Sequence, residues 1–252
     1  MASFDAPVQD FMRRELIAVG PNATLGTISA LLERHDISAV PVLEDQKLRG
    51  IVSIADILRV ESDRTLSLTA ADVMRTPVVT VAPESPLREA ARRMSEHRIH
   101  RVIVCEGQRP VGVLSTRDAM LALEAPPVMA PVREVATASV LTVDLSDSID
   151  SALALLEASN TRGLVVLDED WPVGVFTQTE ALRARALPER QRADPVEHVM
   201  SYETICMNAA TPLYRVARQA RAVRVRRILV VDHRQLCGIA TGFDLVRWIG
   251  EH

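Results

Sequence analysis

The sequence is poor in residue types that several classes of function require. Aromatic residues make up only 3% of the 252 residues, so valine, leucine, isoleucine and alanine must fill the core. Aromatic platforms for stacking nucleic-acid bases are therefore not expected. Lys47 is the single lysine, and the formal net charge of −4 gives no overall attraction to nucleic acid or to an anionic membrane. Nearly all positive charge is arginine, whose guanidinium favours paired contacts to phosphate or carboxylate.

Cysteine and long apolar runs are also scarce. Cys105, Cys206 and Cys237 show neither disulfide-like nor metal-like spacing, and we expect free core thiols in a reducing compartment. The longest apolar runs are far too short to span a bilayer. Asp5 and Asp10 stand where a secretory signal needs basic and apolar segments. These features predict a cytoplasmic protein with no metal site and no membrane contact.

Motifs of catalysis are missing as well. The sequence has no Walker loop, no GxSxG elbow, no HExxH motif and no cluster of cysteine and histidine. Its six histidines do not combine with a nearby serine or cysteine into a nucleophile arrangement. The composition, with 48% apolar and 25% charged residues, is that of an ordinary globular protein. We therefore expect no enzyme, no catalytic residue and no catalytic cofactor.

What the chain does contain is one short pattern that occurs four times. A glycine is followed by two apolar residues, a hydroxyl residue, two variable residues and an acid, and the glycines lie 62, 62 and 64 residues apart. Such regular spacing indicates an internal repeat. Each copy predicts a strand that leads through a hydroxyl N-cap into a helix. The copies are GIVSIAD at 50–56, GVLSTRD at 112–118, GVFTQTE at 174–180 and GIATGFD at 238–244.

The rest of each repeat keeps the same register. A short strand is followed by a helix with apolar residues at helical spacing, and a β-branched run and a polar turn then lead into the glycine strand as a hairpin. Each repeat is therefore β-α-β-β-α, and the chain is α+β. The first helices are expected after a cap or a proline at Thr24, Pro86, Ser148 and Pro212. The closing helices are expected at 55–60, 116–123, 179–186 and 242–249.

A unit of this size would leave one sheet face bare, so the repeats are expected to bury those faces in pairs. Three prolines between residues 126 and 131 cannot continue a helix and indicate a module boundary. The first module is predicted at 1–124, with repeats at 8–60 and 71–123. The second is predicted at 131–252, with repeats at 131–186 and 195–250.

With these repeats in view, the whole chain resembles four CBS domains, named after cystathionine β-synthase, arranged as two tandem Bateman modules. The layout is similar to that of the regulatory gamma subunit of AMP-activated protein kinase. The resemblance implies a regulatory, non-enzymatic protein that binds AMP, ADP or ATP in clefts between paired repeats. S-adenosylmethionine is an alternative ligand. The alternative function is a structural adaptor with vestigial clefts that acts through oligomerisation or partner docking. A protein partner or a homodimer is expected, and nucleic acid is not.

The recurrent Ser/Thr-x-x-Asp/Glu element has two interpretations. In a capping box the hydroxyl accepts a bond from a first-turn N–H and the acid reaches back to the cap, which needs no ligand. The same geometry suits a nucleotide, because the acid can accept hydrogen bonds from ribose hydroxyls while phosphate lies nearby. By the resemblance, the ribose candidates are Asp56, Asp118 and Asp244, and their phosphate-side partners are Ser53, Ser115 and Thr241.

Repeat three departs from this pattern. Glu180 has one more methylene than the aspartates, and its reach differs, whereas Thr177 and Glu180 still form a very good capping box. We expect this copy to be structural, with an empty or altered cleft.

Basic residues stand just before the second strand in three of the four repeats, where repeat one has Ser38 instead. The segment Ile99-His100-Arg101 resembles the His-Arg pair that contacts phosphate in kinase gamma subunits, and the alternative is a solvated strand end. By the resemblance, Thr80 and Val81 line the adenine. The further phosphate-side candidates are His100, Arg101, Arg162, Arg226 and Arg227.

A second basic feature lies on the first helix of repeat four. Arg215, Arg218 and Arg221 are spaced three apart and form one stripe. A solvated face is the first interpretation, and pairing with acids of repeat three or of a partner is the second. Nucleic acid ranks third, because no base-reading motif accompanies the stripe.

Overall fold

The chain divides into two compact units. The N-terminal unit runs to Ala119 and includes Ile249–His252, and the C-terminal unit is Met120–Trp248. The N-terminal unit thus holds repeats one and two, and the C-terminal unit holds repeats three and four. The limits 1–124 and 131–252 stay a prediction. The structure is a computed structural model that describes residues 4–35, 37, 39–57, 60, 68–159, 161, 163–185 and 187–252.

A ten-residue helix forms the first helix of each repeat. Thr24 and Ser148 cap two of these helices, because each side-chain oxygen accepts a hydrogen bond from the N–H three residues on, at 3.3 and 3.1 Å. Pro86 and Pro212 stand at the start of the other two. One apolar face of each helix is buried, as the spacing predicts. The helices are α1 (Leu25–Arg34), α4 (Leu87–Glu96), α6 (Ile149–Ala158) and α9 (Leu213–Ala222).

An antiparallel hairpin follows each of these helices, and all four hairpins share one register. The motif glycine always pairs with the fourth residue of the preceding strand, as Gly112 does with Val104. The pairing shifts at a bulge directly after that pair, as between Val104 and Cys105. The hairpins are β1–β2 (Ala39–Glu44, Lys47–Ser53), β4–β5 (Arg101–Glu106, Arg109–Ser115), β7–β8 (Gly163–Asp168, Trp171–Thr177) and β10–β11 (Arg227–Asp232, Gln235–Thr241).

A third strand pairs in parallel with the first strand of the hairpin in repeats two to four. These strands are β3 (Thr80–Val81), β6 (Thr142–Asp144) and β9 (Thr204–Asn208). In repeat one the corresponding contact is a single parallel bridge between Val19 and Val42. The described residues therefore form three sheets of three strands and one of two.

The closing helix begins directly after the motif hydroxyl in every repeat. In repeat two the sequence predicts one helix over 116–123, but the α-helix ends at Ala119 and a 3₁₀ segment, η3 (Met120–Leu123), follows. The predicted helix residues 58, 59 and 186 lie outside the described part of the chain. The closing helices are α2 (Ile54–Ile57), α5 (Thr116–Ala119), α7 (Gln178–Arg185) and α10 (Gly242–Glu251).

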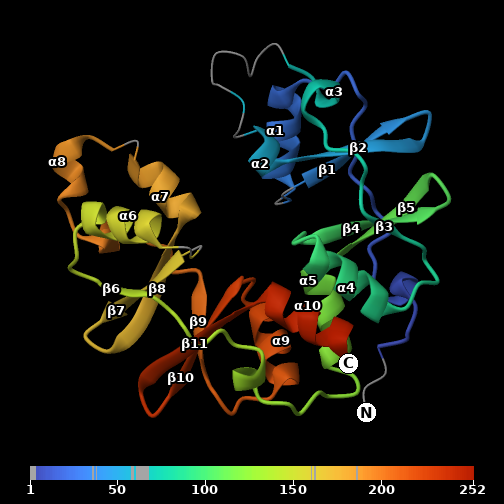
Figure 1. Ribbon diagram of the computed structural model, residues 1–252. Coiled ribbons are helices and arrows are strands. Elements are labelled where there is room, and N and C mark those ends of the chain that lie inside the picture. The colour runs from blue at the N-terminus through green and yellow to red at the C-terminus, as the bar shows by residue number, and fades with distance from the viewer. Residues whose placement is uncertain are drawn as a thin grey trace. The chain divides into compact units, whose positions relative to one another are not determined.

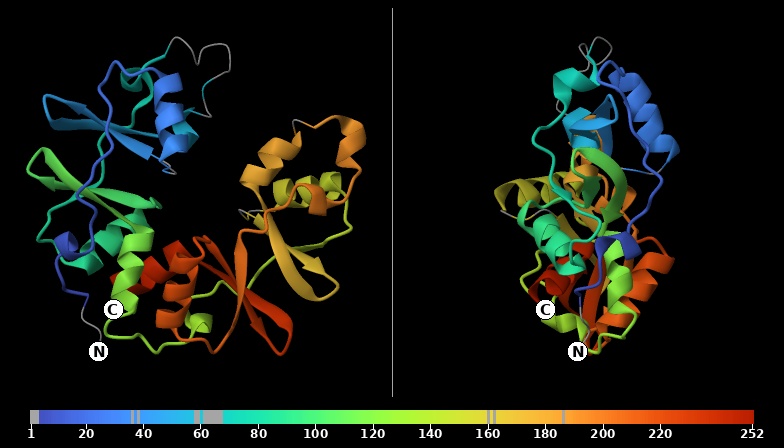
Figure 2. Two further views of the ribbon diagram at one scale, coloured as in Figure 1. Left: turned by 180° about the vertical axis from the view of Figure 1, so that it is seen from behind. Right: turned by 90° about the vertical axis from the view of Figure 1, so that its right-hand side faces the viewer.

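Both faces of the sheet in repeat three are buried. Helices α6 and α7 lie on one face of the sheet β6–β7–β8 (Figures 1 and 2), and Leu164 and Phe176 pack beneath them. The opposite face carries Val165 and Val175, which pack with Leu229 of repeat four. Successive strand residues point to opposite faces, so one strand serves both cores. The sheet faces of paired repeats are therefore buried on each other in this unit, as predicted.

The segment that enters each repeat lies against the other repeat of the same unit. Short helical turns start these segments: η1 (Val8–Asp10), α3 (Ala70–Val73), η4 (Val132–Glu134) and η5 (Val196–His198). A further short helix, α8 (Glu189–Arg192), precedes the last of them. Just beyond each of these four turns the chain forms an antiparallel bridge to the residue after the partner repeat's motif glycine. The bridges, each with two backbone hydrogen bonds of 2.8–3.2 Å, join Arg13 to Val113, Arg75 to Ile51, Thr137 to Ile239 and Ser201 to Val175.

The motif glycine permits this close approach. A Cβ added to Gly112 would lie 2.7 Å from the carbonyl oxygen of Arg13, and one added to Gly174 would lie 2.8 Å from that of Ser201. Both neighbours are backbone atoms that cannot swing aside. The fourfold glycine is thus explained by packing between repeats, independently of any ligand.

Gly112→Ala is expected to lower the free energy of unfolding by about 1–3 kcal/mol, because the new methyl group would force the entry segment away from β5. Gly20→Ala is the matched control, since nothing lies within 4 Å of a Cβ at Gly20. Urea denaturation of both variants measures the difference. Equal stability of the two variants would contradict this account of the motif.

Candidate functional site

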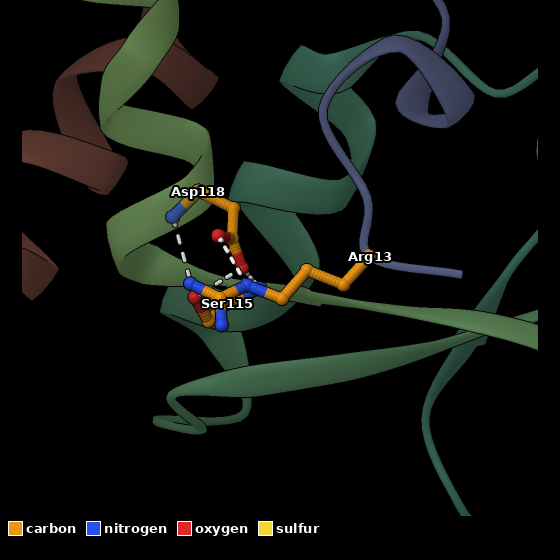
Figure 3. Close-up of polar contacts among 3 residues, drawn as sticks. All are labelled: Arg13, Ser115 and Asp118. Atoms are coloured by element: carbon orange, nitrogen blue, oxygen red, sulfur yellow. Dashed lines mark hydrogen bonds and ion pairs between the residues drawn. The ribbon is translucent and has the colours of Figure 1, made fainter. Parts of the chain in front are cut away.

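The motif hydroxyl and the motif acid are in direct contact in all four repeats. In repeat two the N–H of Ser115 donates to Oδ2 of Asp118 at 3.0 Å, and the N–H of Asp118 donates back to Oγ of Ser115 at 3.2 Å (Figure 3). The Ser115 hydroxyl donates to the same Oδ2. This is the expected capping box. The acid accepts the same backbone and hydroxyl bonds between Ser53 and Asp56, Thr177 and Glu180, and Thr241 and Asp244.

The four acids differ in their exposure. Asp56, Asp118 and Glu180 expose only 6, 7 and 8% of their surface. The side chain of Asp244 is 15% exposed. A carboxylate this deep in the protein must be hydrogen-bonded or paired with a positive charge. One oxygen of each carboxylate is already bonded to the motif hydroxyl residue. The donor bonded to the other oxygen therefore limits what further ligand the carboxylate can accept.

In the N-terminal unit an arginine from the other repeat meets that second oxygen. Arg13 lies on the entry segment of repeat one. Its Nε donates to Oδ1 of Asp118 in repeat two at 3.1 Å (Figure 3). Arg75 lies on the entry segment of repeat two, and its Nε donates to Oδ1 of Asp56 in repeat one. The two ion pairs are thus reciprocal. Each arginine side chain is more than half exposed, whereas each aspartate side chain is at least nine-tenths buried.

The C-terminal unit has different residues at the corresponding positions. Thr137 and Ser201 occupy the bridge positions of Arg13 and Arg75, and neither can neutralise a carboxylate. Oδ1 of Asp244 instead lies 3.3 Å from Arg247, three residues further along α10. The arginine at Asp244 therefore comes from the same helix and not from the partner repeat.

An arginine predicted as a site residue lies at the motif of repeat three. Arg227, at the start of β10 in repeat four, lies 3.5 Å from Oγ1 of Thr177. Burial lowers the pKa of the Arg227 guanidinium, and the nearby Glu180 carboxylate acts in the opposite direction. The half-buried guanidinium of Arg227, from the paired repeat, thus lies beside the Thr177–Glu180 capping box.

The other predicted site residues stand near the strand starts. Arg101 begins β4 and is partly buried, and the exposed His100 precedes it, its carbonyl oxygen accepting from the N–H of Thr116. Thr80 is partly buried, and Val81 is 3% exposed. Arg226 is exposed, while Ser38 and Arg162 lie outside the described residues.

Arg13 and Arg75 are not among the site residues predicted from the sequence. A signal was present, because both residues follow a methionine, at Met12 and Met74, in the same register of the repeat. The repeat alignment places them equivalently, but it does not show that each entry segment crosses to the other repeat. Only the strand pairing reveals that crossing.

The arginine stripe on α9 has a partner within its own unit. Arg218 lies 3.3 Å from Glu124, and Arg221 pairs with the same carboxylate. Arg215 and Arg218 also lie over the Tyr214 ring, at 5.8 and 5.9 Å from its centroid. Two of the three stripe arginines thus pair with an acid just after η3, and among the described residues none of the three is paired with an acid of repeat three.

Glu124→Ala is expected to lower the free energy of unfolding by about 1–3 kcal/mol, because it leaves the half-buried Arg221 without its carboxylate. Glu157→Ala, which breaks a pair with Arg185 that is 55% exposed on both sides, is the control. Its cost should stay below about 1 kcal/mol. Thermal unfolding of both variants measures the two losses of stability. Equal losses would show that the pairs of Glu124 with Arg218 and Arg221 stabilise the protein no more than an exposed ion pair does.

The three cysteines are free, but only Cys105 is buried, where burial raises the pKa of its thiol. The expectation of three core thiols is wrong for Cys206 and Cys237, which are exposed on β9 and β11. No helix in the described part of the chain has the length and apolar character of a membrane crossing. Within that part, no three His, Cys, Asp or Glu side chains are grouped to hold a metal.

Comparisons with known proteins give relatives of limited identity. The uncharacterized protein MJ1404 of Methanocaldococcus jannaschii is 23% identical over 269 residues, covering 97% of this chain. The chain spans only 62% of the length of that relative. Hypoxic response protein 1 of Mycobacterium tuberculosis is 33% identical over 137 residues, which cover 53% of this chain and 94% of that protein.

Two solved structures share the fold over nearly the whole chain. Protein MJ1225 of Methanocaldococcus jannaschii, described as a candidate archaeal homolog of γ-AMPK, matches with a TM-score of 0.73 and 16% identity over 96% of this chain and 99% of that one. An uncharacterized conserved protein of Pyrococcus horikoshii matches with a TM-score of 0.69 and 23% identity over the same shares. The expected likeness in layout is therefore confirmed.

The repeats themselves match a family model. The CBS domain model matches residues 8–63, 70–125, 132–187 and 196–251, which together cover most of the chain. Each matched range holds one repeat with its glycine motif, complete as β-α-β-β-α in repeats two to four and with a single bridge at Val19 in place of the first strand in repeat one. The chain is α+β, built of tandem CBS pairs as in Bateman modules, and it belongs to the CBS-domain family.

Proposed function

We propose that the chain is a regulatory protein that binds AMP, ADP or ATP in clefts between paired repeats and catalyses no reaction. The observation that carries the proposal is a set of three carboxylates, Asp56, Asp118 and Asp244, each held rigid by the hydroxyl residue before its helix. A fixed carboxylate can accept hydrogen bonds from the two vicinal hydroxyls of ribose. Membership of the CBS family supports the same class of ligand.

The remaining predicted residues take roles that fit a nucleotide. His100 and Arg101, and Arg226 and Arg227, stand at strand starts and would supply positive charge to the phosphates. Ser53, Ser115 and Thr241 would hold the carboxylates and lie near the phosphate side. Thr80 and Val81 would line the adenine.

Binding would regulate a partner by shifting the packing of the repeats. A nucleotide can bias that equilibrium only as far as it binds one arrangement more tightly than the other. Asp118 and Asp56 of the N-terminal unit are each bonded to the paired repeat, so a nucleotide that binds them would act on both repeats at once. A protein partner or a second copy of the chain would respond to the change.

A calorimetric titration of the full chain with AMP, ADP, ATP, GMP and GTP tests the proposal. Adenine nucleotides are expected to bind with micromolar to millimolar affinity, and guanine nucleotides more weakly. Flat titrations with all five ligands at millimolar concentration would contradict it. Turnover of the nucleotide during the titration would contradict the non-enzymatic part.

A structural adaptor is the second candidate, and one observation favours it. The carboxylates of Asp56 and Asp118 are more than nine-tenths buried and already paired with arginine, as in a site that has become structural. An adaptor would show flat nucleotide titrations together with concentration-dependent self-association. Sedimentation velocity on the same sample measures that association.

A further inference from the structure

The carboxylate of Asp118 has limited room for a sugar. Oδ2 already accepts two hydrogen bonds from Ser115, one from the N–H and one from the hydroxyl. Each carboxylate oxygen has about two acceptor positions, so Oδ2 is full. Oδ1 accepts from Nε of Arg13 at 3.1 Å, which leaves it one position. Two ribose hydroxyls therefore cannot both bind this carboxylate while Arg13 remains in place.

We propose that Arg13 and Arg75 determine the ligand selectivity of the N-terminal unit, by excluding uncharged nucleosides from Asp118 and Asp56 and admitting phosphorylated ones. This inference rests on the proposed nucleotide binding. The ribose displaces each arginine from its carboxylate, and the displaced guanidinium then pairs with the phosphate of the same ligand. A nucleoside offers the guanidinium no new partner.

The charges explain why the two ligand classes separate. The Arg13–Asp118 pair is neutral as a unit, and its carboxylate side is nearly buried while its arginine side is 65% exposed. A neutral sugar that breaks the pair replaces a bond between two charged groups with bonds in which only the carboxylate is charged, and it leaves the guanidinium without an anionic partner. A phosphorylated ligand replaces the lost bond with an arginine–phosphate contact, which is also charge-assisted. The long exposed side chain of Arg13 is free to make that exchange without unfolding its segment.

The reciprocal pairing of Arg13 and Arg75 limits the proposed selectivity to the N-terminal unit. Arg13 and Arg75 hold the same bridge position in the two repeats, and each pairs with the carboxylate of the other. Thr137 and Ser201 hold that position in the C-terminal unit and carry no guanidinium. Asp244 pairs instead with Arg247 of its own helix, and Arg227 reaches the Thr177–Glu180 box from the start of β10 and not from an entry segment. The two units are therefore expected to rank adenosine and AMP differently.

Calorimetric titration with adenosine and with AMP tests the inference on the full chain carrying Asp244→Ala, which removes the aspartate of the C-terminal unit. The measured quantity is the ratio of the adenosine Kd to the AMP Kd. In the variant that also carries Arg13→Thr and Arg75→Thr, adenosine should bind more tightly and AMP no more tightly, so that the ratio falls roughly tenfold. Arg14→Thr, an exposed arginine on the same segment, is the control and should leave the ratio unchanged.

The outcomes separate the two proposals. AMP binding with a ratio that the double substitution does not change overturns the selectivity role while leaving nucleotide binding intact. Loss of both ligands in equal proportion shows that the arginines only support the fold, and it overturns the role as well. An Asp244→Ala chain that binds neither ligand contradicts nucleotide binding at Asp56 and Asp118 themselves.

Discussion

Asp118→Ala is expected to remove much of the rise in melting temperature that AMP, ADP or ATP produces. A ligand at about one hundred times its Kd stabilises a protein by about 2.7 kcal/mol, which corresponds to roughly 5–10 °C in a chain of this size. Alanine offers no acceptor to the ribose hydroxyls, so the cleft of repeat two loses its sugar contact. Differential scanning fluorimetry with and without nucleotide measures the shift.

The capping role of Asp118 requires its own control. Thr69 and Asp72 form the same box at the start of α3, with bonds of 2.8 and 2.7 Å from the N–H and hydroxyl of Thr69 to Asp72, on an exposed surface. Asp72→Ala therefore removes a cap without touching a candidate cleft. It should lower the melting temperature of the free protein and leave the nucleotide-induced rise intact. A rise that is equally reduced in both variants would mean that Asp118 acts only as a cap.

Arg101→Ala is expected to weaken AMP and ATP binding by roughly ten- to a hundredfold, since a hydrogen bond to a charged group contributes about 1.5–3 kcal/mol. Adenosine and S-adenosylmethionine carry no phosphate, so their affinities should change little. The comparison therefore also separates a phosphorylated ligand from S-adenosylmethionine. Calorimetric titration of each ligand into the variant provides the measurement.

Arg109→Ala is the matched control for Arg101→Ala. Arg109 begins the neighbouring strand β5 of the same hairpin and is exposed at its turn end. Its removal takes away the same charge from the same sheet and should leave every affinity unchanged. If Arg101→Ala weakens adenosine as strongly as AMP, Arg101 supports the shape of the cleft and does not contact phosphate.

The fourfold spacing predicts most of the fold. The hairpins and the buried stripes follow from local rules on turn residues and periodicity and appear in every repeat, whereas side-chain caps such as Thr24 start two of the four first helices and a proline starts the other two. The α-helix end at Ala119 was missed, because Met120–Leu123 are good helix formers and their 3₁₀ turn depends on packing against α9. Packing between elements therefore sets the end of this α-helix, and the local sequence does not.

The candidate site was less accessible from the sequence. The Ser115–Asp118 contact follows from the three-residue spacing alone, and it appears as predicted. The pair of Arg13 with Asp118 joins residues 105 apart in the chain, and no local pattern connects them. The reason for the motif glycine was likewise hidden, because it lies in the approach of a distant backbone segment to Gly112.

Binding of 2′,3′-dideoxy-AMP compared with AMP tests the central claim most directly. The two ligands share base and phosphate, and they differ only in the hydroxyls that the carboxylates are proposed to bind. The account predicts that the dideoxy ligand binds the wild-type chain at least about tenfold more weakly, since two charge-assisted hydrogen bonds are lost. It also predicts that a chain with Asp56, Asp118 and Asp244 all changed to alanine binds the two ligands equally. Equal affinity of the wild-type chain for both ligands would contradict ribose recognition by these aspartates.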